Sequence, residues 1–78
     1  MRKKKETLIV TFSTTAQAMQ MERFCAEKGI AGRLIPVPQE ISAGCGLSWK
    51  AEPSQRENLQ EAMRLGRISW EVMYELVV

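Results

Sequence analysis

Residues 6–15 of the chain read ETLIVTFSTT, in which an apolar alternation passes directly into a run of small hydroxyl residues. Leu8, Val10 and Phe12 fall on one face of an extended chain, because successive side chains of a strand point to opposite faces. This pattern predicts a strand over residues 6–12 with one buried face. The hydroxyl run is typical of a helix start, so we expect a helix to follow at once.

The expected helix has recognisable ends. Thr14 and Gln17 have the spacing of a capping box, in which a threonine side chain and a glutamine side chain satisfy free backbone N–H groups. Lys28 suits the negative end of the helix dipole, and Gly29 is a plausible stop. The residues spaced for an apolar stripe along this helix are Ala18, Met21 and Cys25.

Two further strands are expected in the middle of the chain. Residues 33–37 alternate but contain Pro36, which cannot donate a ladder hydrogen bond. A strand with an internal proline belongs at the edge of a sheet. Residues 47–51 alternate as well and predict the next strand.

The last third of the chain predicts a helix and a strand. Ser54 and Glu57 form a second possible capping box just after a proline, and Gly66 is a natural terminator for the helix they open. Within residues 68–78, large apolar side chains alternate with Glu71, Met73 and Glu75, which predicts a strand with one clearly buried face. That face would carry Trp70, Val72, Tyr74 and Leu76.

The expected order is therefore β-α-β-β-α-β. With right-handed crossovers, this order favours an α+β fold, the ferredoxin-like two-layer sandwich. Its four-stranded antiparallel sheet carries two helices on one face, and the strand order 4-1-3-2 places the second strand at an edge. We expect a single domain over residues 6–78, preceded by a basic disordered tail over residues 1–5.

Composition and charge narrow the classes of function. The 78 residues contain no apolar run near the roughly 18 residues that span a bilayer, and no signal peptide is visible, so we expect a cytoplasmic protein. Arg2 and the lysines at positions 3–5 carry four positive charges, so the net charge of +2 becomes −2 without them. A negative body argues against nucleic acid as a partner, although the tail alone could contact RNA.

The chain has two cysteines and no histidine. Two thiols do not complete a zinc site, which requires four ligands, so we expect no metal and no cofactor. The missing histidine excludes hydrolytic Cys-His catalysis within this chain. Cys25 lies at helical spacing with apolar residues, so it is interpreted as a core residue.

Cys45 has a different setting, in the loop over residues 36–46, which reads PVPQEISAGCG. Gly44 and Gly46 flank it and allow unusual backbone angles. Such a loop can turn backbone N–H groups toward one point, which favours an anion such as a thiolate. Cys45 is therefore a candidate reactive thiol, and the alternative is a small residue that fills a glycine-rich turn.

The expected topology gives this loop a neighbour. The first helix begins at the same end of the sandwich as the loop, and its free N–H groups carry a partial positive charge. Thr14 and Thr15 at that helix end could bind an anion beside Cys45, or could simply cap the helix. The candidate binding residues around Cys45 are Ser42, Gly44, Gly46, Thr14 and Thr15.

Two stretches resemble a known family, the putative Se/S carrier protein-like family, over about residues 7–50. The first is residues 33–38, RLIPVP, followed by residues 40–47, EISAGCGL. The second is residues 11–15, TFSTT, followed by Ala18, Met19 and Glu22. The resemblance implies a small carrier of sulfur or selenium, with Cys45 as the attachment point.

The resemblance leads to a first hypothesis for the function. A donor enzyme, such as a cysteine desulfurase or a selenocysteine lyase, would load Cys45 with a persulfide or selenopersulfide, and an acceptor protein would receive the atom. Such a chain is a carrier rather than an enzyme. The identity of the cargo, sulfur or selenium, stays open.

A second hypothesis is a non-catalytic protein- or ligand-binding module, because ferredoxin-like domains host many unrelated functions. In that case Cys45 would be incidental. A homodimer through the open face of the sheet is a further possibility, if Ile9 and Met73 make that face apolar.

Overall fold

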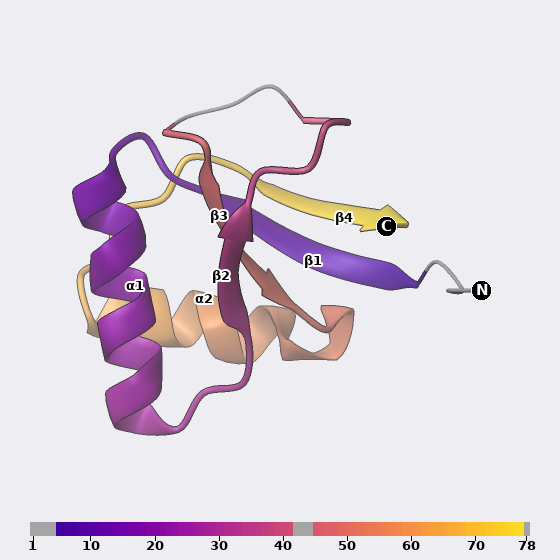
Figure 1. Ribbon diagram of the computed structural model, residues 1–78. Helices are drawn as coiled ribbons and strands as arrows, with labels where there is room; N and C mark the ends of the chain where they lie inside the picture. Colours follow the sequence, from indigo (N-terminus) through magenta and orange to yellow (C-terminus); the bar gives the residue numbers. More distant parts are fainter. Residues whose placement is uncertain (1–4, 42–44, 78) are drawn as a thin grey trace.

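A computed structural model describes residues 5–41 and 45–77 of the chain. The expected basic tail therefore lies outside the described residues, except for Lys5. The elements in chain order are β1 (Glu6–Thr11), α1 (Thr15–Lys28), β2 (Arg33–Pro36), β3 (Leu47–Ala51), a 3-10 turn η1 (Pro53–Gln55), α2 (Arg56–Leu65) and β4 (Met73–Val77). This is the β-α-β-β-α-β order predicted from the sequence (Figure 1).

The four strands form one antiparallel sheet in the order β2-β3-β1-β4. β1 is a central strand, and its Val10 lies opposite Trp49 of β3 on one side and Met73 of β4 on the other. β2 pairs with β3 alone and is an edge strand, as predicted from Pro36. The strand order is also the one expected for a ferredoxin-like sandwich.

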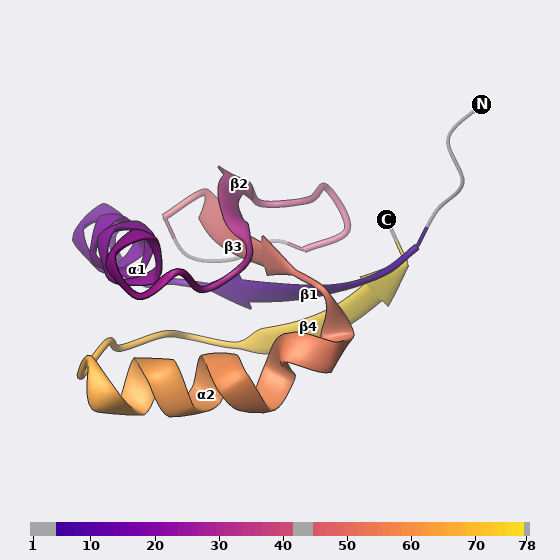
Figure 2. The same cartoon turned by 90° about the horizontal axis from the view of Figure 1, so that it is seen from below.

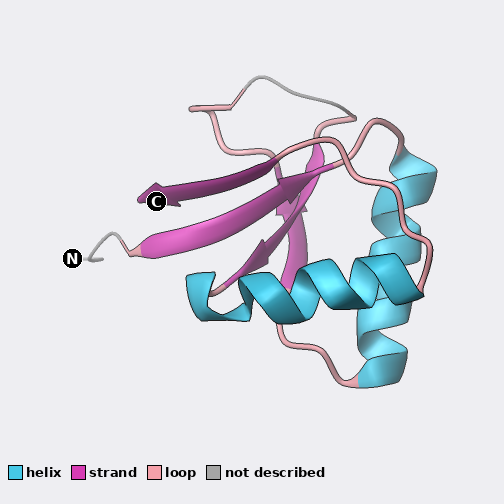
Figure 3. Ribbon diagram, turned by 180° about the vertical axis from the view of Figure 1, so that it is seen from behind, coloured by secondary structure: helices cyan, strands magenta, loops and turns pink. Residues whose placement is uncertain are grey.

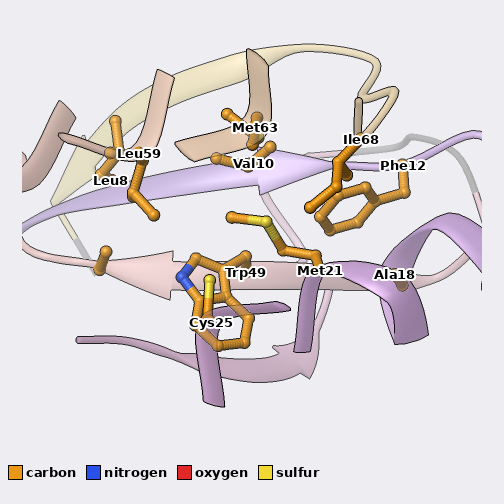
Figure 4. Close-up of a cluster of buried hydrophobic side chains, with 11 residues drawn as sticks. Leu8, Val10, Phe12, Ala18, Met21, Cys25, Trp49, Leu59, Met63 and Ile68 are labelled. Carbon is orange, nitrogen blue, oxygen red and sulfur yellow. The ribbon is translucent and has the colours of Figure 1, made fainter. Parts of the chain in front are cut away.

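The hydrophobic core lies between one face of this sheet and the two helices (Figures 2 and 3). Figure 4 shows Met21 and Cys25 of α1 pointing toward Trp49 of β3, with Leu59 and Met63 of α2 nearby. The buried cluster is made of Leu8, Val10, Phe12, Ala18, Met21, Cys25, Trp49, Ala51, Leu59, Met63 and Ile68. Both helices therefore cover the same face, which confirms the two-layer α+β fold.

The ends of α1 are those that the sequence predicts. Thr14 is the N-cap, and its hydroxyl accepts a hydrogen bond from the N–H of Gln17 at 3.2 Å. The Gln17 side chain in turn accepts from the N–H of Ser13 at 3.0 Å. At the other end Gly29 has φ 68°, the left-handed conformation that glycine adopts without strain, and the N–H of Ile30 donates to the carbonyl of Cys25 at 2.9 Å.

The start of α2 differs from the prediction. The expected capping box at Ser54 and Glu57 is wrong, because no side-chain hydrogen bond caps the helix there. Ser54 lies inside η1, where the N–H of Gln55 already donates to the carbonyl of Glu52 at 2.9 Å. The proline at position 53 starts this tighter turn, so the serine lies one residue before the N-cap, Gln55, and does not act as a cap.

The end of α2 does involve Gly66, as predicted, but in a different role. Gly66 has right-handed backbone angles, and a Cβ there would lie 2.9 Å from the ring of Phe24. The left-handed position falls on Arg67, with φ 53°. The next residue, Ile68, donates its N–H to the carbonyl of Met63 at 2.9 Å and inserts its side chain into the core. Gly66 is thus required for close packing.

The last strand begins later than predicted, and only part of the expected alternation holds: Tyr74 and Leu76 are half-buried, while Glu75 and Val77 are exposed. β4 starts at Met73, and Met73 packs against the core because it lies opposite Val10. Trp70 and Val72, expected on the buried face, are 38% and 39% exposed. The chain leaves α2 through the left-handed turn at Arg67, so the extended alternation cannot start at residue 68.

This register also corrects the expectation for the open face of the sheet. Ile9 lies opposite Tyr74, on the face away from the helices, whereas Met73 lies on the helix side. The two residues therefore do not share a face. Ile9 is itself fully buried, and so is the hydroxyl-bearing Thr11 beside it.

Candidate functional site

The chain returns to the sheet at Cys45 and is held there by backbone hydrogen bonds. The N–H of Cys45 donates to the carbonyl of Phe12, just past the end of β1, at 3.0 Å. The N–H of Val37 donates to the carbonyl of Gly46 at 2.9 Å. The backbone of Cys45 is thus hydrogen-bonded to the residue after β1, and the backbone of Gly46 is hydrogen-bonded to the residue after β2.

The Cys45 side chain lies at the boundary between the core and solvent. The residue is half-buried and packs against the edge of the hydrophobic cluster. Its sulfur lies 4.0 Å from the carbonyl oxygen of Leu47, the limit of a weak S–H hydrogen bond. Cys45 is therefore neither enclosed in the core nor fully exposed.

Gly46 gives the backbone the shape that this placement needs. It has φ 89° and is exposed, and a Cβ added there would meet no atom within 4 Å. The positive φ, rather than close packing, is the reason for a glycine at this position. The two other loop residues predicted to contribute, Ser42 and Gly44, lie outside the described residues.

The start of α1 lies at the same end of the sandwich as Cys45. Figure 1 shows the β1–α1 connection at the end of the sandwich where β2 ends and β3 begins. Thr14 is two residues beyond Phe12, the hydrogen-bond partner of Cys45. The hydroxyl of Thr14 is engaged in capping, while Thr15 begins the helix and is exposed. The N–H of Cys45 is used by Phe12, so it is not available to an anion.

Cys25 has a contrasting environment. Its side chain is 1% exposed and belongs to the core between α1 and the sheet. Burial raises the pKa of the Cys25 thiol from 9.0 to about 11, because ionisation would place a charge among apolar side chains. Cys25 and Cys45 are both free thiols. Cys25 is a core residue, as the sequence analysis expected.

The segment between α2 and β4 also reaches this end of the molecule, and sequence reasoning missed it. The N–H of Glu71 donates to the carbonyl of Thr11 at 2.7 Å, and the N–H of Thr11 donates to the carbonyl of Val72 at 2.9 Å. The Thr11 hydroxyl adds a hydrogen bond from the N–H of Val72 at 3.1 Å. Strand alternation had assigned Trp70 and Val72 to the core, and only the signature of a glycine and an arginine after the helix could have suggested a turn.

The described residues offer no preformed metal site. No group of three or more His, Cys, Asp or Glu side chains among them could hold a metal ion. A surface hollow lined by Phe24, Ile30 and Leu65 lies between the ends of the two helices, and another lies beside Gly32 and Trp49. Cys45 lines neither hollow.

No helix in the described part of the chain has the length and apolar character that crossing a bilayer requires. Searches of curated proteins and of solved structures each found no match. A family model described as putative Se/S carrier protein-like matches residues 7–75. The match includes Cys45 and every strand and helix that positions it, except the first and last residues of the sheet. The chain therefore belongs to the putative Se/S carrier protein-like family.

Proposed function

We propose that this chain carries sulfur or selenium as a persulfide or selenopersulfide on Cys45. The single observation that carries the proposal is the contrast between the two thiols in a chain of this family. Cys25 is sealed in the core, whereas Cys45 lies half-buried at the end of β1. A carried atom needs a sulfur that another protein can reach, and the lower burial of Cys45 supports its choice over Cys25.

The loading step is a thiol exchange. The Cys45 thiolate attacks the terminal sulfur of a persulfide, R–S–SH, on the donor enzyme. A bond forms between the Cys45 sulfur and the terminal sulfur, the S–S bond of the donor breaks, and the donor leaves as the thiolate R–S⁻. The product on this chain is Cys45–S–SH, and no external oxidant or reductant is consumed. With R–S–SeH as donor, the same exchange gives Cys45–S–SeH.

Release uses the same chemistry in the other direction. A thiolate of the acceptor protein attacks the terminal atom on Cys45, and Cys45 leaves as its thiolate. Neither step needs a histidine base on this chain, because a thiolate attacks and a thiolate leaves in each exchange. We therefore class the chain as a carrier rather than an enzyme.

The two classes of partner follow from this chemistry. The donor is a persulfide-forming enzyme, such as a cysteine desulfurase or a selenocysteine lyase, and the acceptor is a protein with a nucleophilic thiol. We place the carrier in the cytoplasm, because a chain with two free thiols suits a reducing compartment.

Intact-mass spectrometry tests the proposal. The purified chain is incubated with a cysteine desulfurase and cysteine, or with a selenocysteine lyase and selenocysteine. We expect a gain of about 32 Da for sulfur or about 79 Da for selenium, lost on mild reduction. Cys25→Ala is the matched control and should load normally. Loading of Cys45→Ser to the level of the wild type would refute the proposal.

A further inference from the structure

The surface hollow between the two helices has the size of a small-molecule site. It measures about 570 Å³, and sites for small ligands occupy about 300–1,000 Å³. Figure 3 shows the end of α2 beside α1, with the two helices running in very different directions. They meet at Phe24, because a Cβ on Gly66 would lie 2.9 Å from the Phe24 ring. We refer to this space as the interhelix hollow.

The walls of the interhelix hollow are mainly apolar. Phe24 and Ile30 contribute half-buried side chains from α1 and the turn after it, and Ala62 contributes from α2. Leu65, at the end of α2, is 65% exposed, the highest value among the large apolar side chains of the described residues. Because apolar surface in contact with water is unfavourable, a ligand with an apolar body gains free energy by covering these side chains.

One charge at the interhelix hollow is positive and has no carboxylate partner. Lys28 lines the hollow, and its Nζ lies 5.9 Å from the centroid of the Phe24 ring. Lys28 makes no ion pair among the described residues. The end of the α1 dipole and the aromatic ring both favour the ammonium group, but neither neutralises its charge.

The other polar residues of the interhelix hollow do not offset this charge. Glu61 lines the hollow too, but its carboxylate is already paired with Arg64 on the same helix. Asn58 is neutral, and its amide N–H donates to the side chain of Gln55 at 3.2 Å. The hollow therefore combines an apolar wall with one unpaired ammonium group.

We propose that the interhelix hollow binds a small amphiphilic carboxylate. The apolar body of the ligand covers Phe24, Ile30 and Leu65, and its carboxylate pairs with Lys28. A monoanion fits better than a dianionic phosphate ester, because one ammonium group balances one negative charge. Cys45 does not line the hollow, so this binding site is independent of the proposed carrier function.

NMR titration of the full chain with octanoate tests the proposal. We expect saturable changes in backbone amide shifts that are confined to residues 24–30 and 58–66. Octanol has the same chain without the charge, and octylammonium carries the opposite charge. Octanoate should bind about three- to fivefold more tightly than octanol, the range typical of one exposed ion pair. Octylammonium should bind more weakly than octanol.

Two variants separate the contributions of charge and apolar surface. Lys28→Gln removes the charge, so the Kd for octanoate should rise about three- to fivefold, to that of octanol, while the Kd for octanol stays the same. Leu65→Ser removes apolar wall, so both Kd values should rise about threefold or more. Lys50→Gln and Val77→Ser are the matched controls outside the hollow and should bind as the wild type does.

Each contrary outcome overturns the proposal. The absence of saturable shifts with octanoate would mean that the interhelix hollow does not bind this class of ligand. Equal affinity for octanoate and octanol, or an unchanged Kd in Lys28→Gln, would remove the role of the charge. Shift changes spread over the sheet and the core would indicate non-specific binding. Cys45→Ser should bind octanoate normally, so this test is independent of persulfide loading. Circular dichroism of every variant verifies the fold.

Discussion

The core around Cys25 and the rim around Cys45 place the same thiol in two different settings. Cys25 lies on the inner face of α1 and is 1% exposed, and its partners are apolar side chains from the sheet and α1. Cys45 lies where a loop returns to the sheet and is half-buried. Cys25 is packed between α1 and the sheet, while backbone hydrogen bonds hold the loop residue Cys45 at the end of the sheet. The comparison teaches that position in the fold sets how deeply each thiol is buried.

The largest expected difference between the two settings is in alkylation. Iodoacetamide reacts with thiolates, and at pH 8 a thiol with a pKa of about 11 is ionised in about one molecule in a thousand. We expect Cys45 to be alkylated at least about 100-fold faster than Cys25, because burial also blocks the reagent from Cys25. Peptide mapping after timed quenching measures both rates.

Denaturant provides the control for the alkylation experiment. In guanidinium chloride the two thiols should react at similar rates, because the environment that protects Cys25 is lost. Equal rates in the native protein would contradict the contrast between the two settings.

Two glycines test how tightly each region is packed. A Cβ on Gly32 would lie 2.3 Å from the indole nitrogen of Trp49, and Gly32 has φ 134°. We expect Gly32→Ala to lower the free energy of unfolding by about 3 kcal/mol, because a clash and backbone strain add together. Gly46, beside Cys45, has open space around it, so Gly46→Ala should cost only about 1 kcal/mol of backbone strain.

Urea denaturation followed by far-UV circular dichroism measures both glycine variants. Greater destabilisation of Gly46→Ala than of Gly32→Ala would contradict this prediction, since it would mean that the chain is tightly packed beside Cys45. The indole N–H of Trp49 is buried and has no acceptor among the described residues. The indole N–H therefore makes no hydrogen bond that would keep the ring in place, and a larger residue at position 32 would displace the ring.

The pH dependence of stability should carry the signature of Cys25. The unfolded thiol ionises near its ordinary pKa of 9.0, whereas the folded thiol ionises at about 11. Between these values the unfolded chain has lost its proton and the folded chain has kept it, so stability falls as pH rises. We expect this group to remove about 2 kcal/mol of stability between pH 9 and pH 11.

Cys25→Ala isolates that contribution. Urea midpoints of the wild type and the variant are compared at several pH values from 8 to 11. All other titratable groups are common to both chains. The wild type should lose stability more steeply, and parallel curves would show that the Cys25 thiol is not held neutral by the fold.

Much of the core region could be predicted from the sequence. The alternation of Leu8, Val10 and Phe12 and the spacing of Met21 and Cys25 repeat with the periods of a strand and a helix, so the buried faces follow directly. The edge position of β2 followed from a proline that cannot donate. These features depend on local periodicity and on one rule of backbone chemistry.

The rim was harder to predict, because tertiary contacts decide it. The alternation from Trp70 to Leu76 suits a strand in either register, and the turn at Arg67 selected the register that exposes Trp70. Topology predicts the end of the sandwich at which Cys45 lies, and its hydrogen bond to Phe12 is at that end. The hydrogen bond that occupies the Cys45 N–H could not be predicted, since no local sequence pattern specifies it.

The smallest expected effect concerns Arg67, the left-handed residue that follows α2. α1, which carries Cys25, ends at Gly29 with φ 68°, whereas α2 ends with Arg67 in the same left-handed region at φ 53°. A side chain in this region costs about 1 kcal/mol or more, which a glycine avoids. Glycine also makes the unfolded chain more flexible, which offsets part of the gain.

We therefore expect Arg67→Gly to stabilise the chain by about 0.5 kcal/mol and to raise the melting temperature by about 2–4 °C. The reciprocal variant, Gly29→Arg, should destabilise by about 1 kcal/mol, because no atom lies within 4 Å of a Cβ there and backbone strain acts alone. Thermal unfolding followed by circular dichroism compares the two. A loss of stability in Arg67→Gly would mean that the arginine side chain contributes more than its backbone costs. Backbone strain would then not distinguish Arg67, after α2, from Gly29, at the end of the helix that carries Cys25.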